Sequence, residues 1–172
     1  MILPIRHVPD AILKTPTRPI TTVTPEIHQL ARDMIHTMHA AAGVGLAANQ
    51  VGQPWQLFVA SPDGQPGREL VLLNPVIVRR RGRLRLEEGC LSIPGIAAVV
   101  TRAAEVEVRA VTLEGKECAL EGQELLARIF QHEIDHLNGL LFVDRLSWWN
   151  RQRALRAYRR QRKTLAQVSL PQ

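Results

Sequence analysis

Hydrophobic and polar positions follow two different periods along this chain. In residues 25–41, apolar side chains recur every three or four positions, at Ile27, Leu30, Ala31, Met34, Ile35 and Met38. This spacing places them on one face and predicts a helix. Thr24 is a suitable N-cap and Pro25 suits the first helical position. Gly43 and Gly45 then end the helix.

Residues 55–121 instead show the two-residue period of strands. Val106 and Val108 alternate with Glu105, Glu107 and Arg109, which is typical of a strand with one face in water. Turn residues separate the other apolar runs. We expect strands at 56–60, 70–73, 76–80, 83–87, 97–101, 105–110 and 117–120, with turns at 63–64, 74–75, 81–82 and 114–115.

The helical period returns after the strands. Residues 123–138 predict a second helix, with Gly139 at its C-terminal cap, and a third helix is expected from Trp148 with Ser147 as its cap. The order of elements predicts an α+β fold, with mostly antiparallel strands packed around the helix at 123–138. We divide the chain into a catalytic domain at 1–147 and a basic C-terminal helix or tail at 148–172.

Composition restricts the class of protein. The chain has 172 residues, of which 45% are hydrophobic, so it is long enough for one domain with one core. Its apolar runs are too short for a membrane span, and the first residues lack the pattern of a secretory leader. Two cysteines are too few for a disulfide scaffold. We expect a cytoplasmic monomer with both thiols reduced.

The net charge of +6 is concentrated in the tail. Eight of the 22 Lys and Arg residues lie from Arg145 onward, where Asp and Glu are absent, and 14 basic and 16 acidic residues remain elsewhere. A basic tail on a nearly neutral body suggests a polyanionic partner. A helix face that is charged only because it is solvated is the alternative.

The clearest chemical signal is the sequence HEIDH at 132–136. His132 and His136 are four residues apart on a helix, so both imidazoles can reach one metal ion, and Glu133 can act on a water molecule beside it. Catalytic sites of this kind use three protein ligands. Cys90, which follows Gly89, is the best candidate for the third ligand. By themselves, the histidines could be a chance spacing and Cys90 a core thiol.

Three segments together resemble the peptide deformylase family. They are residues 43–50 (GVGLAANQ), 88–92 (EGCLS) and 131–136 (QHEIDH), in the order and spacing of that family. The resemblance implies hydrolysis of the formyl group from the N-terminal formyl-methionine of nascent polypeptides, with release of formate. It implies that Cys90, His132 and His136 hold one divalent metal ion, that Glu133 is the acid and base, and that Gln50 and the Leu91 N–H bind the formyl oxygen.

The resemblance also implies the metal and the surroundings of the site. The native ion is expected to be Fe²⁺, with Zn²⁺, Ni²⁺ or Co²⁺ able to substitute. We expect the residues that bind substrate to be Val44, Gly45, Leu86, Leu125 and Ile129. We expect a group behind the metal ligands that orients them, made of Glu88, Arg102 and Asp135, and an ion pair on the surface is the alternative. Arg128, Ala97 and Asn49 depart from the family pattern and could alter substrate or inhibitor preference.

Two other functions remain open at this point. The same HExxH chemistry is compatible with a metallopeptidase that cleaves internal peptide bonds. A non-enzymatic ribosome-binding protein with a structural metal is also possible, although such a metal normally has four protein ligands. In the deformylase interpretation, the basic tail would dock on the RNA-rich ribosome surface, where nascent chains emerge, with an affinity that falls steeply with salt.

Overall fold

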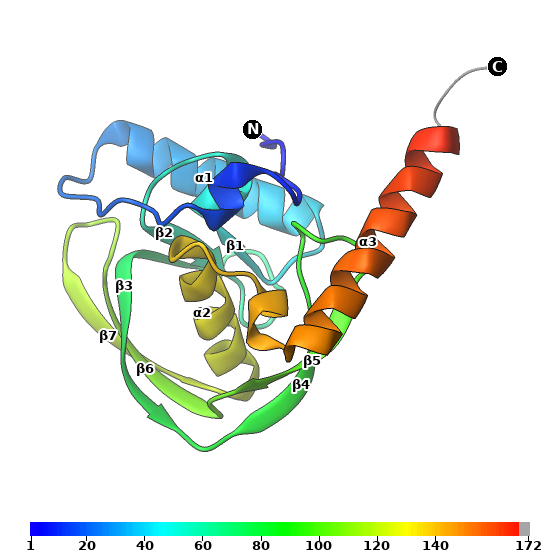
Figure 1. Ribbon diagram of the computed structural model, residues 1–172. Coiled ribbons are helices and arrows are strands. Elements are labelled where there is room, and N and C mark those ends of the chain that lie inside the picture. The colour runs from blue at the N-terminus through cyan, green and yellow to red at the C-terminus, as the bar shows by residue number, and fades with distance from the viewer. Residues whose placement is uncertain (169–172) are drawn as a thin grey trace.

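The computed structural model describes the backbone of residues 1–168 and the side chains of residues 1–164; the last four residues of the predicted tail lie outside the described part. Two sheets and three helices form the structure (Figure 1). The helices are α1 (Pro25–Ala40), α2 (Glu124–Leu137) and α3 (Trp148–Val168), with short 3-10 helices at Ala11–Lys14, Ala48–Val51 and Phe142–Arg145. The strands are β1 (Gly45–Ala47), β2 (Leu57–Ala60), β3 (Leu70–Arg81), β4 (Leu84–Gly89), β5 (Ala97–Arg102), β6 (Glu105–Val111) and β7 (Glu117–Gln123).

The strands form two antiparallel sheets with α2 between them. Five strands pair in the order β1-β2-β3-β6-β7, and β4 pairs with β5. The larger sheet curves around α2, and the β4–β5 hairpin lies on the other side of that helix (Figure 1). The predicted α+β fold, with antiparallel strands around the HExxH helix, is therefore confirmed.

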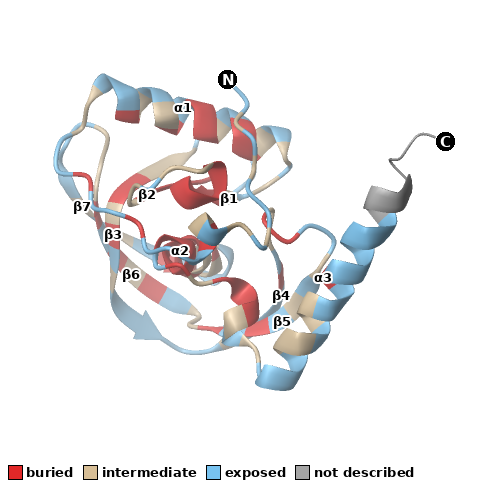
Figure 2. Cartoon of the chain, turned by 45° about the horizontal axis from the view of Figure 1, so that its top comes forward, coloured by how far each residue is buried: buried red, intermediate tan, exposed pale blue. Residues whose placement is uncertain are grey.

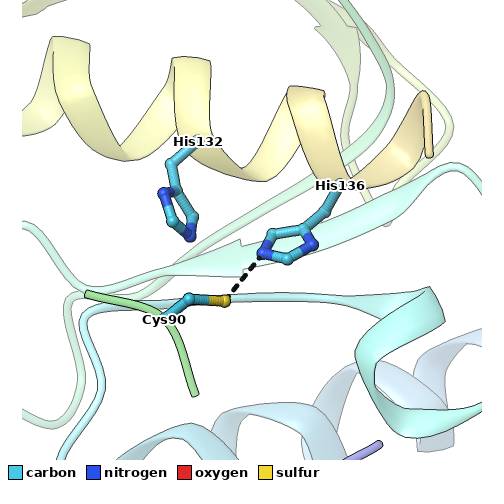
Figure 3. A group of neighbouring side chains, drawn as sticks. All are labelled: Cys90, His132 and His136. Atoms are coloured by element: carbon cyan, nitrogen blue, oxygen red, sulfur yellow. Dashed lines mark hydrogen bonds between the residues drawn. The ribbon is translucent and has the colours of Figure 1, made fainter. Parts of the chain in front are cut away.

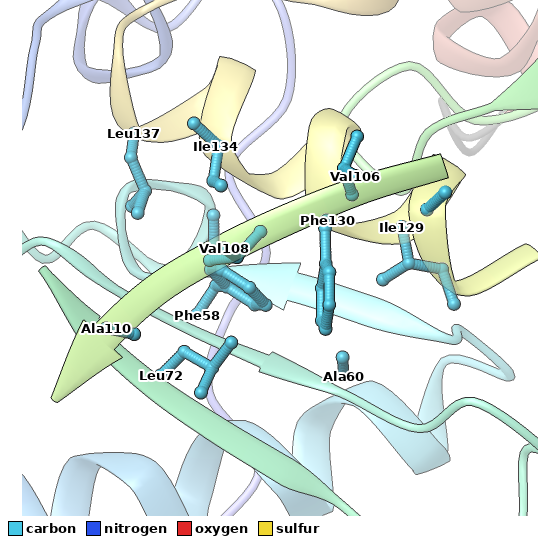
Figure 4. Packing of buried hydrophobic residues seen from close by; sticks show 12 residues of the cluster. Phe58, Ala60, Leu72, Val106, Val108, Ala110, Ile129, Phe130, Ile134 and Leu137 are labelled. Atoms are coloured by element: carbon cyan, nitrogen blue, oxygen red, sulfur yellow. The ribbon is translucent and has the colours of Figure 1, made fainter. Parts of the chain in front are cut away.

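The two-residue period of the strands gives the larger sheet an apolar core on each face. Phe58, Ala60 and Leu72 face α2, where they pack with side chains of β6 and α2 (Figure 4). The neighbouring residues Leu57, Val59 and Leu73 face α1 and contact Ile27, Ala31, Met34 and Met38. This alternation explains why a sheet with one long helix on each face can bury both of its surfaces.

Helix α2 is buried on almost all sides (Figure 2). Ile129, Phe130, Ile134 and Leu137 pack against the sheet, and the Phe58 and Phe130 rings lie 6.0 Å apart between centroids. Each fully buried side chain of this size contributes about 2 kcal/mol to the free energy of unfolding. The helix is therefore firmly held, and so are the polar side chains that it carries.

One predicted turn is wrong. Residues 70–73 and 76–80 form one strand, β3, and not two strands separated at Asn74 and Pro75. The pairing register shifts between Leu73 and Val76, and Asn74 has a φ of 50°. Pro75 has no N–H to donate, but a bulge accommodates it, and the Asn74 side chain bonds both backbone groups of Ile20. The proline therefore interrupts the hydrogen-bond ladder without ending the strand.

The third helix begins at Trp148 as predicted. The Ser147 Oγ accepts a hydrogen bond from the Asn150 N–H, as expected of a cap. Tyr158 is buried against Leu13, Ile93 and Leu141, whereas the arginines of the opposite face are exposed (Figure 2). Within the described residues, every helix is too short or too polar to cross a lipid bilayer. The division into 1–147 and 148–172 stays a prediction.

Candidate metal centre and active site

Three predicted ligands meet between α2 and the end of β4. His132 and His136 project from one side of the helix, and Cys90 approaches them directly after β4 (Figure 3). The Cys90 Sγ lies 3.2 Å from the His136 Nε2, and the three donor atoms all lie within 4.8 Å of one another. Among the described residues no other three His, Cys, Asp or Glu side chains converge in this way.

The protein fixes the orientation of both imidazoles. The His132 Nδ1 lies 3.0 Å from the Glu88 Oε2, which leaves its Nε2 for the metal position. Burial alone would lower the pKa of His132, but the contacts with Cys90 and Glu88 raise it above its usual range. Burial lowers the pKa of His136 well below its usual range, which keeps that ring neutral. A neutral imidazole is the form that binds a metal, so His136 is already in that form, whereas His132 gives up its second proton when a metal binds.

Glu133 is a buried carboxyl beside the ligands. It is 3% exposed, and its Oε2 has no hydrogen-bond partner among the described residues. Burial raises its pKa to about 7. A carboxyl whose pKa is near the working pH is suited to both accept and release a proton. An unpartnered buried oxygen beside three metal-type donors also fits a site that is completed by a metal and water.

Gln50 and Leu91 lie on the other side of Cys90. The Gln50 Oε1 accepts a hydrogen bond from the Ala47 N–H at 2.8 Å, which directs its amide nitrogen toward Ser92 Oγ at 3.2 Å and Cys90 Sγ at 3.5 Å. The backbone N–H of Leu91 has no partner among the described residues. Two residues with a hydrogen-bond donor, Gln50 and Leu91, thus line the same cleft as Cys90.

The predicted group behind the ligands forms a chain of charged contacts. The Arg102 guanidinium donates to both Glu88 oxygens, at 2.8 and 2.9 Å, and also to Asp135. Burial alone would raise the pKa of Glu88, but the bonds from Arg102 and His132 lower it to about 2. Glu88 is therefore a carboxylate that accepts the His132 Nδ1–H and fixes the tautomer of that ring. Arg145 continues the chain because it also donates to Asp135.

A cleft of about 560 Å³ opens above the metal ligands. Val44, Gly45 and Ile129 line it, as predicted for residues that bind substrate. Leu86 and Leu125 are not among the lining residues, and each is 37% exposed. Their part in substrate binding stays a prediction. Arg128 and Ala97, two of the departures from the family pattern, both line the cleft.

Sequence reasoning did not expect three residues to support the metal ligands, although the structure places them in this network, and it considered Asn49 only for substrate or inhibitor preference. Ser92 is fully buried and accepts from Gln50, and the Asn49 amide donates to the His136 backbone oxygen at 2.5 Å. The third is Arg145. Ser92 and Asn49 are polar residues inside the two motifs, which was an available signal, whereas nothing in the local sequence singles out Arg145.

A Cys–His–His group with a buried carboxyl beside it, carried by an α+β fold, defines a metal-dependent hydrolase. The chain matches the model of the polypeptide deformylase family over residues 2–152. It is 48% identical to a peptide deformylase of Nitrosococcus oceani over 94% of this chain and 97% of that protein, and 42% identical to that of Aquifex aeolicus over 93% and 96%. The chain belongs to the polypeptide deformylase family.

Solved structures agree with this assignment. The crystal structure of a peptide deformylase from Legionella pneumophila matches with a TM-score of 0.92 and 40% identity, over 99% of this chain and all of that one. One from Synechococcus elongatus, in complex with actinonin, matches with a TM-score of 0.86 and 40% identity, over 90% and 86%. The predictions of the family and of enzyme activity are confirmed.

Proposed function

We propose that this site hydrolyses the formyl amide of N-formyl-methionine at the start of nascent polypeptides, releasing formate and a free amine. Metal-dependent deformylation is the reaction of the family to which the chain belongs. The residues assigned below are our proposal. The observation that carries it is the convergence of Cys90, His132 and His136 beside the buried carboxyl of Glu133.

Cys90, His132 and His136 would hold one divalent metal ion. Three protein donors leave a further position open, which is the pattern of a catalytic metal and not of a structural one. When bound, such an ion acts as a Lewis acid that makes water nucleophilic near neutral pH. One thiolate with two imidazoles suits Fe²⁺, Zn²⁺, Ni²⁺ and Co²⁺, and we propose Fe²⁺ as the native ion.

The identity of the ion has a direct test. The protein is purified without oxygen, and metal content and activity per metal are measured before and after exposure to air. We expect activity to be lost in air and restored by Fe²⁺. Full activity in air with stoichiometric Zn²⁺ would contradict the assignment of iron.

Glu133 would transfer the proton during the reaction. Its carboxylate takes a proton from the attacking water and later delivers it to the amine nitrogen as the carbon–nitrogen bond breaks. The raised pKa of Glu133, due to burial, suits both steps. Glu133→Gln keeps the size of the side chain but cannot transfer the proton. It should retain metal and lose at least about a hundredfold in kcat.

Gln50 and Leu91 would stabilise the negative charge that grows on the formyl oxygen. The Gln50 amide and the Leu91 N–H are both donors beside Cys90. Each donor in a comparable oxyanion site is worth about 3–4 kcal/mol. The substrate backbone would lie along β1, which is an edge strand of the larger sheet and pairs with β2. Val44 and Ile129 would contact the methionine side chain.

The two alternative functions are separated by substrate. A metallopeptidase would digest casein, whereas the proposed enzyme should leave casein intact and release formate from formyl-Met-Ala. A non-enzymatic metal protein would do neither. If casein is cleaved at a rate similar to that of formyl-Met-Ala, the proposal is wrong.

We also propose that α3 docks on the ribosome surface, that the enzyme is a monomer and that it works in the cytoplasm. Arg153, Arg156 and Arg160 are exposed on α3, and the Trp148 and Trp149 side chains are 59% and 77% exposed at its start. Because Tyr158 of the same helix is buried in the body, removing α3 would uncover apolar surface. Reversing the charge of these arginines is therefore a cleaner test than removing the helix.

The triple variant Arg153→Glu, Arg156→Glu and Arg160→Glu should keep its activity on formyl-Met-Ala and lose co-sedimentation with ribosomes at low salt. Arg79, which is paired with Glu107 and Glu121 on the sheet, offers a matched control site. Unchanged co-sedimentation of the triple variant would refute the docking role of α3. Size-exclusion chromatography with light scattering tests whether the enzyme is a monomer.

A further inference from the structure

A second cavity lies between α3 and the N-terminal segment of the chain. It shares no lining residue with the cleft above the metal ligands. Its volume is about 220 Å³, below the roughly 300–1,000 Å³ of pockets that hold drug-sized ligands, so it fits a small molecule. Its apolar walls come from the N-terminal segment, from the residues before α3 and from α3 itself: Val8, Pro9, Leu141, Val143 and Leu155.

The remaining walls of this cavity carry an excess of positive charge. Among the described residues, four cations and no carboxylate line it: Lys14, Arg151, Arg159 and Arg162. Lys14 and Arg151 share one carboxylate, that of Asp144, which lies outside the lining. Within the described part of the chain, neither Arg159 nor Arg162 forms an ion pair. Because concave, apolar walls strengthen the field of such charges, the cavity favours an anion.

The arginines of the cavity belong to the side of α3 that packs on the body. One helix face contains residues 151, 155, 158, 159 and 162, because these positions recur every three or four residues. Tyr158 of this face is 3% exposed, and Leu155 packs against the same core cluster. A helix face that packs on a body is normally apolar. Here three of the five positions are arginines, which suits a bound anion better than packing alone.

Tyr158 offers a further hydrogen-bond donor to the cavity. A buried tyrosine hydroxyl usually has a partner, but that of Tyr158 has none among the described residues, and the residue lines the cavity. Burial raises the pKa of Tyr158, so the hydroxyl keeps its proton at neutral pH. The Arg162 Cζ lies 5.9 Å from the centre of the Tyr158 ring, and its Nη1 donates to the Val8 backbone oxygen at 2.7 Å. Arg162 is therefore held beside a hydroxyl that is free to donate.

We propose that this cavity binds a phosphate monoester whose organic group is small and apolar. Four cations less the one charge of Asp144 leave an excess of three positive charges. A phosphate monoester, with a charge of about −2 at pH 7, matches this excess better than a carboxylate does. Arg159, Arg162 and the Tyr158 hydroxyl would donate to its oxygens, since arginine matches the geometry of phosphate. The apolar walls would contact the organic group. The site is separate from the metal centre and does not depend on the proposed function.

Calorimetric titration of the full, metal-loaded chain with phenyl phosphate tests the proposal. We expect saturable binding with a Kd of about 1 mM or tighter. Inorganic phosphate and phenol, which each present one half of the ligand, should bind at least about tenfold more weakly. Arg159→Ala and Tyr158→Phe should each raise the Kd for phenyl phosphate at least about tenfold, because each removes a donor to a charged group. Arg159 is exposed and phenylalanine keeps the ring of Tyr158, so both variants should fold.

Arg156→Ala is the matched control, because Arg156 is an exposed arginine of α3 that does not line the cavity. Solvent screens its charge from the cavity, so the Kd should stay within about twofold of the wild type. An unchanged Kd in both Arg159→Ala and Tyr158→Phe would overturn the proposal, and competitive inhibition of formate release would then place phenyl phosphate at the metal centre. Absence of binding up to about 10 mM, or an equal affinity for inorganic phosphate, would also refute it.

Discussion

Gly45→Ala tests how closely the backbone of β1 packs against the proposed acid–base residue. A Cβ added at Gly45 would lie 2.4 Å from the Glu133 Oε1 and 2.9 Å from its Cδ. An ordinary contact needs about 3.5 Å, so the carboxyl must retreat by about 1 Å. Gly45 does not have a positive φ, so alanine itself strains no backbone there. The expected effect therefore comes from displacement of Glu133 alone.

A displacement of this size should be costly to the reaction and nearly neutral to metal binding. An error of about 1 Å in the position of a catalytic group can cost about a hundredfold in rate, which corresponds to about 2.7 kcal/mol. The three metal ligands are not touched by the new methyl group, since its nearest neighbours are all atoms of Glu133. We expect kcat on formyl-Met-Ala to fall about a hundredfold with unchanged metal content.

The assay is steady-state formate release, with metal analysis and thermal melting on the same preparation. Gly43→Ala is the graded comparison, because its Cβ would meet only the flexible end of Leu91, with the Cδ1 at 2.9 Å. The kcat of Gly43→Ala should fall by less than about tenfold. A Gly45→Ala enzyme with full metal and a kcat within threefold of the wild type would refute the role given to the position of Glu133.

Three other substitutions give distinct readouts. Glu88→Gln should weaken metal binding about 10- to 100-fold, measured by chelator competition, because the amide no longer accepts the His132 proton as a carboxylate does; unchanged affinity would contradict this. Ser92→Ala should lower kcat by up to about tenfold, with KM little changed, because Gln50 loses the contact that orients its amide; rescue by threonine is the control. Asp144→Asn should cost about 1–2 kcal/mol of unfolding free energy at pH 7, measured in urea. Burial alone would raise the pKa of Asp144, but hydrogen bonds from Lys14, the Leu141 N–H and Arg151 lower it. That stabilisation is therefore present above the unfolded pKa of about 4 and is lost as the pH falls through the folded pKa; a difference from wild type that does not shrink as the pH falls below about 4 would contradict it.

The local part of the site could be predicted from sequence. His132 and His136 share a helix side because four residues make about one turn, and the apolar period around them predicts that helix. The position of Cys90 next to the two histidines could not be predicted from local periodicity. It is 42 residues from His132, and only the pairing of β4 with β5 and the packing of α2 bring the two together. The family resemblance supplied that contact in advance, and periodicity did not.

The residues of the substrate pocket were also hard to predict, because they come from elements that are distant in the sequence. Leu125 and Leu86 were assigned to it from the helix face and from the family resemblance, and neither lines the cleft. One residue that lines the cleft, Arg128, instead bonds a backbone oxygen of another element, that of Glu87. A side chain as long and flexible as arginine can point to solvent or back to the protein, and its own sequence neighbourhood does not decide between them.

The sequence by itself therefore determined the elements, the two metal-binding imidazoles on one helix and the acid beside them, because these depend on the chain's own periodicity over a few residues. The tertiary structure alone decided that β3 continues through Pro75, that Ser92, Asn49 and Arg145 support the ligands, and that Arg128 bonds the Glu87 backbone oxygen. These features depend on which strands pair and how α2 packs between two sheets. Contacts between such distant residues arise from the packing of the whole domain and not from any local pattern.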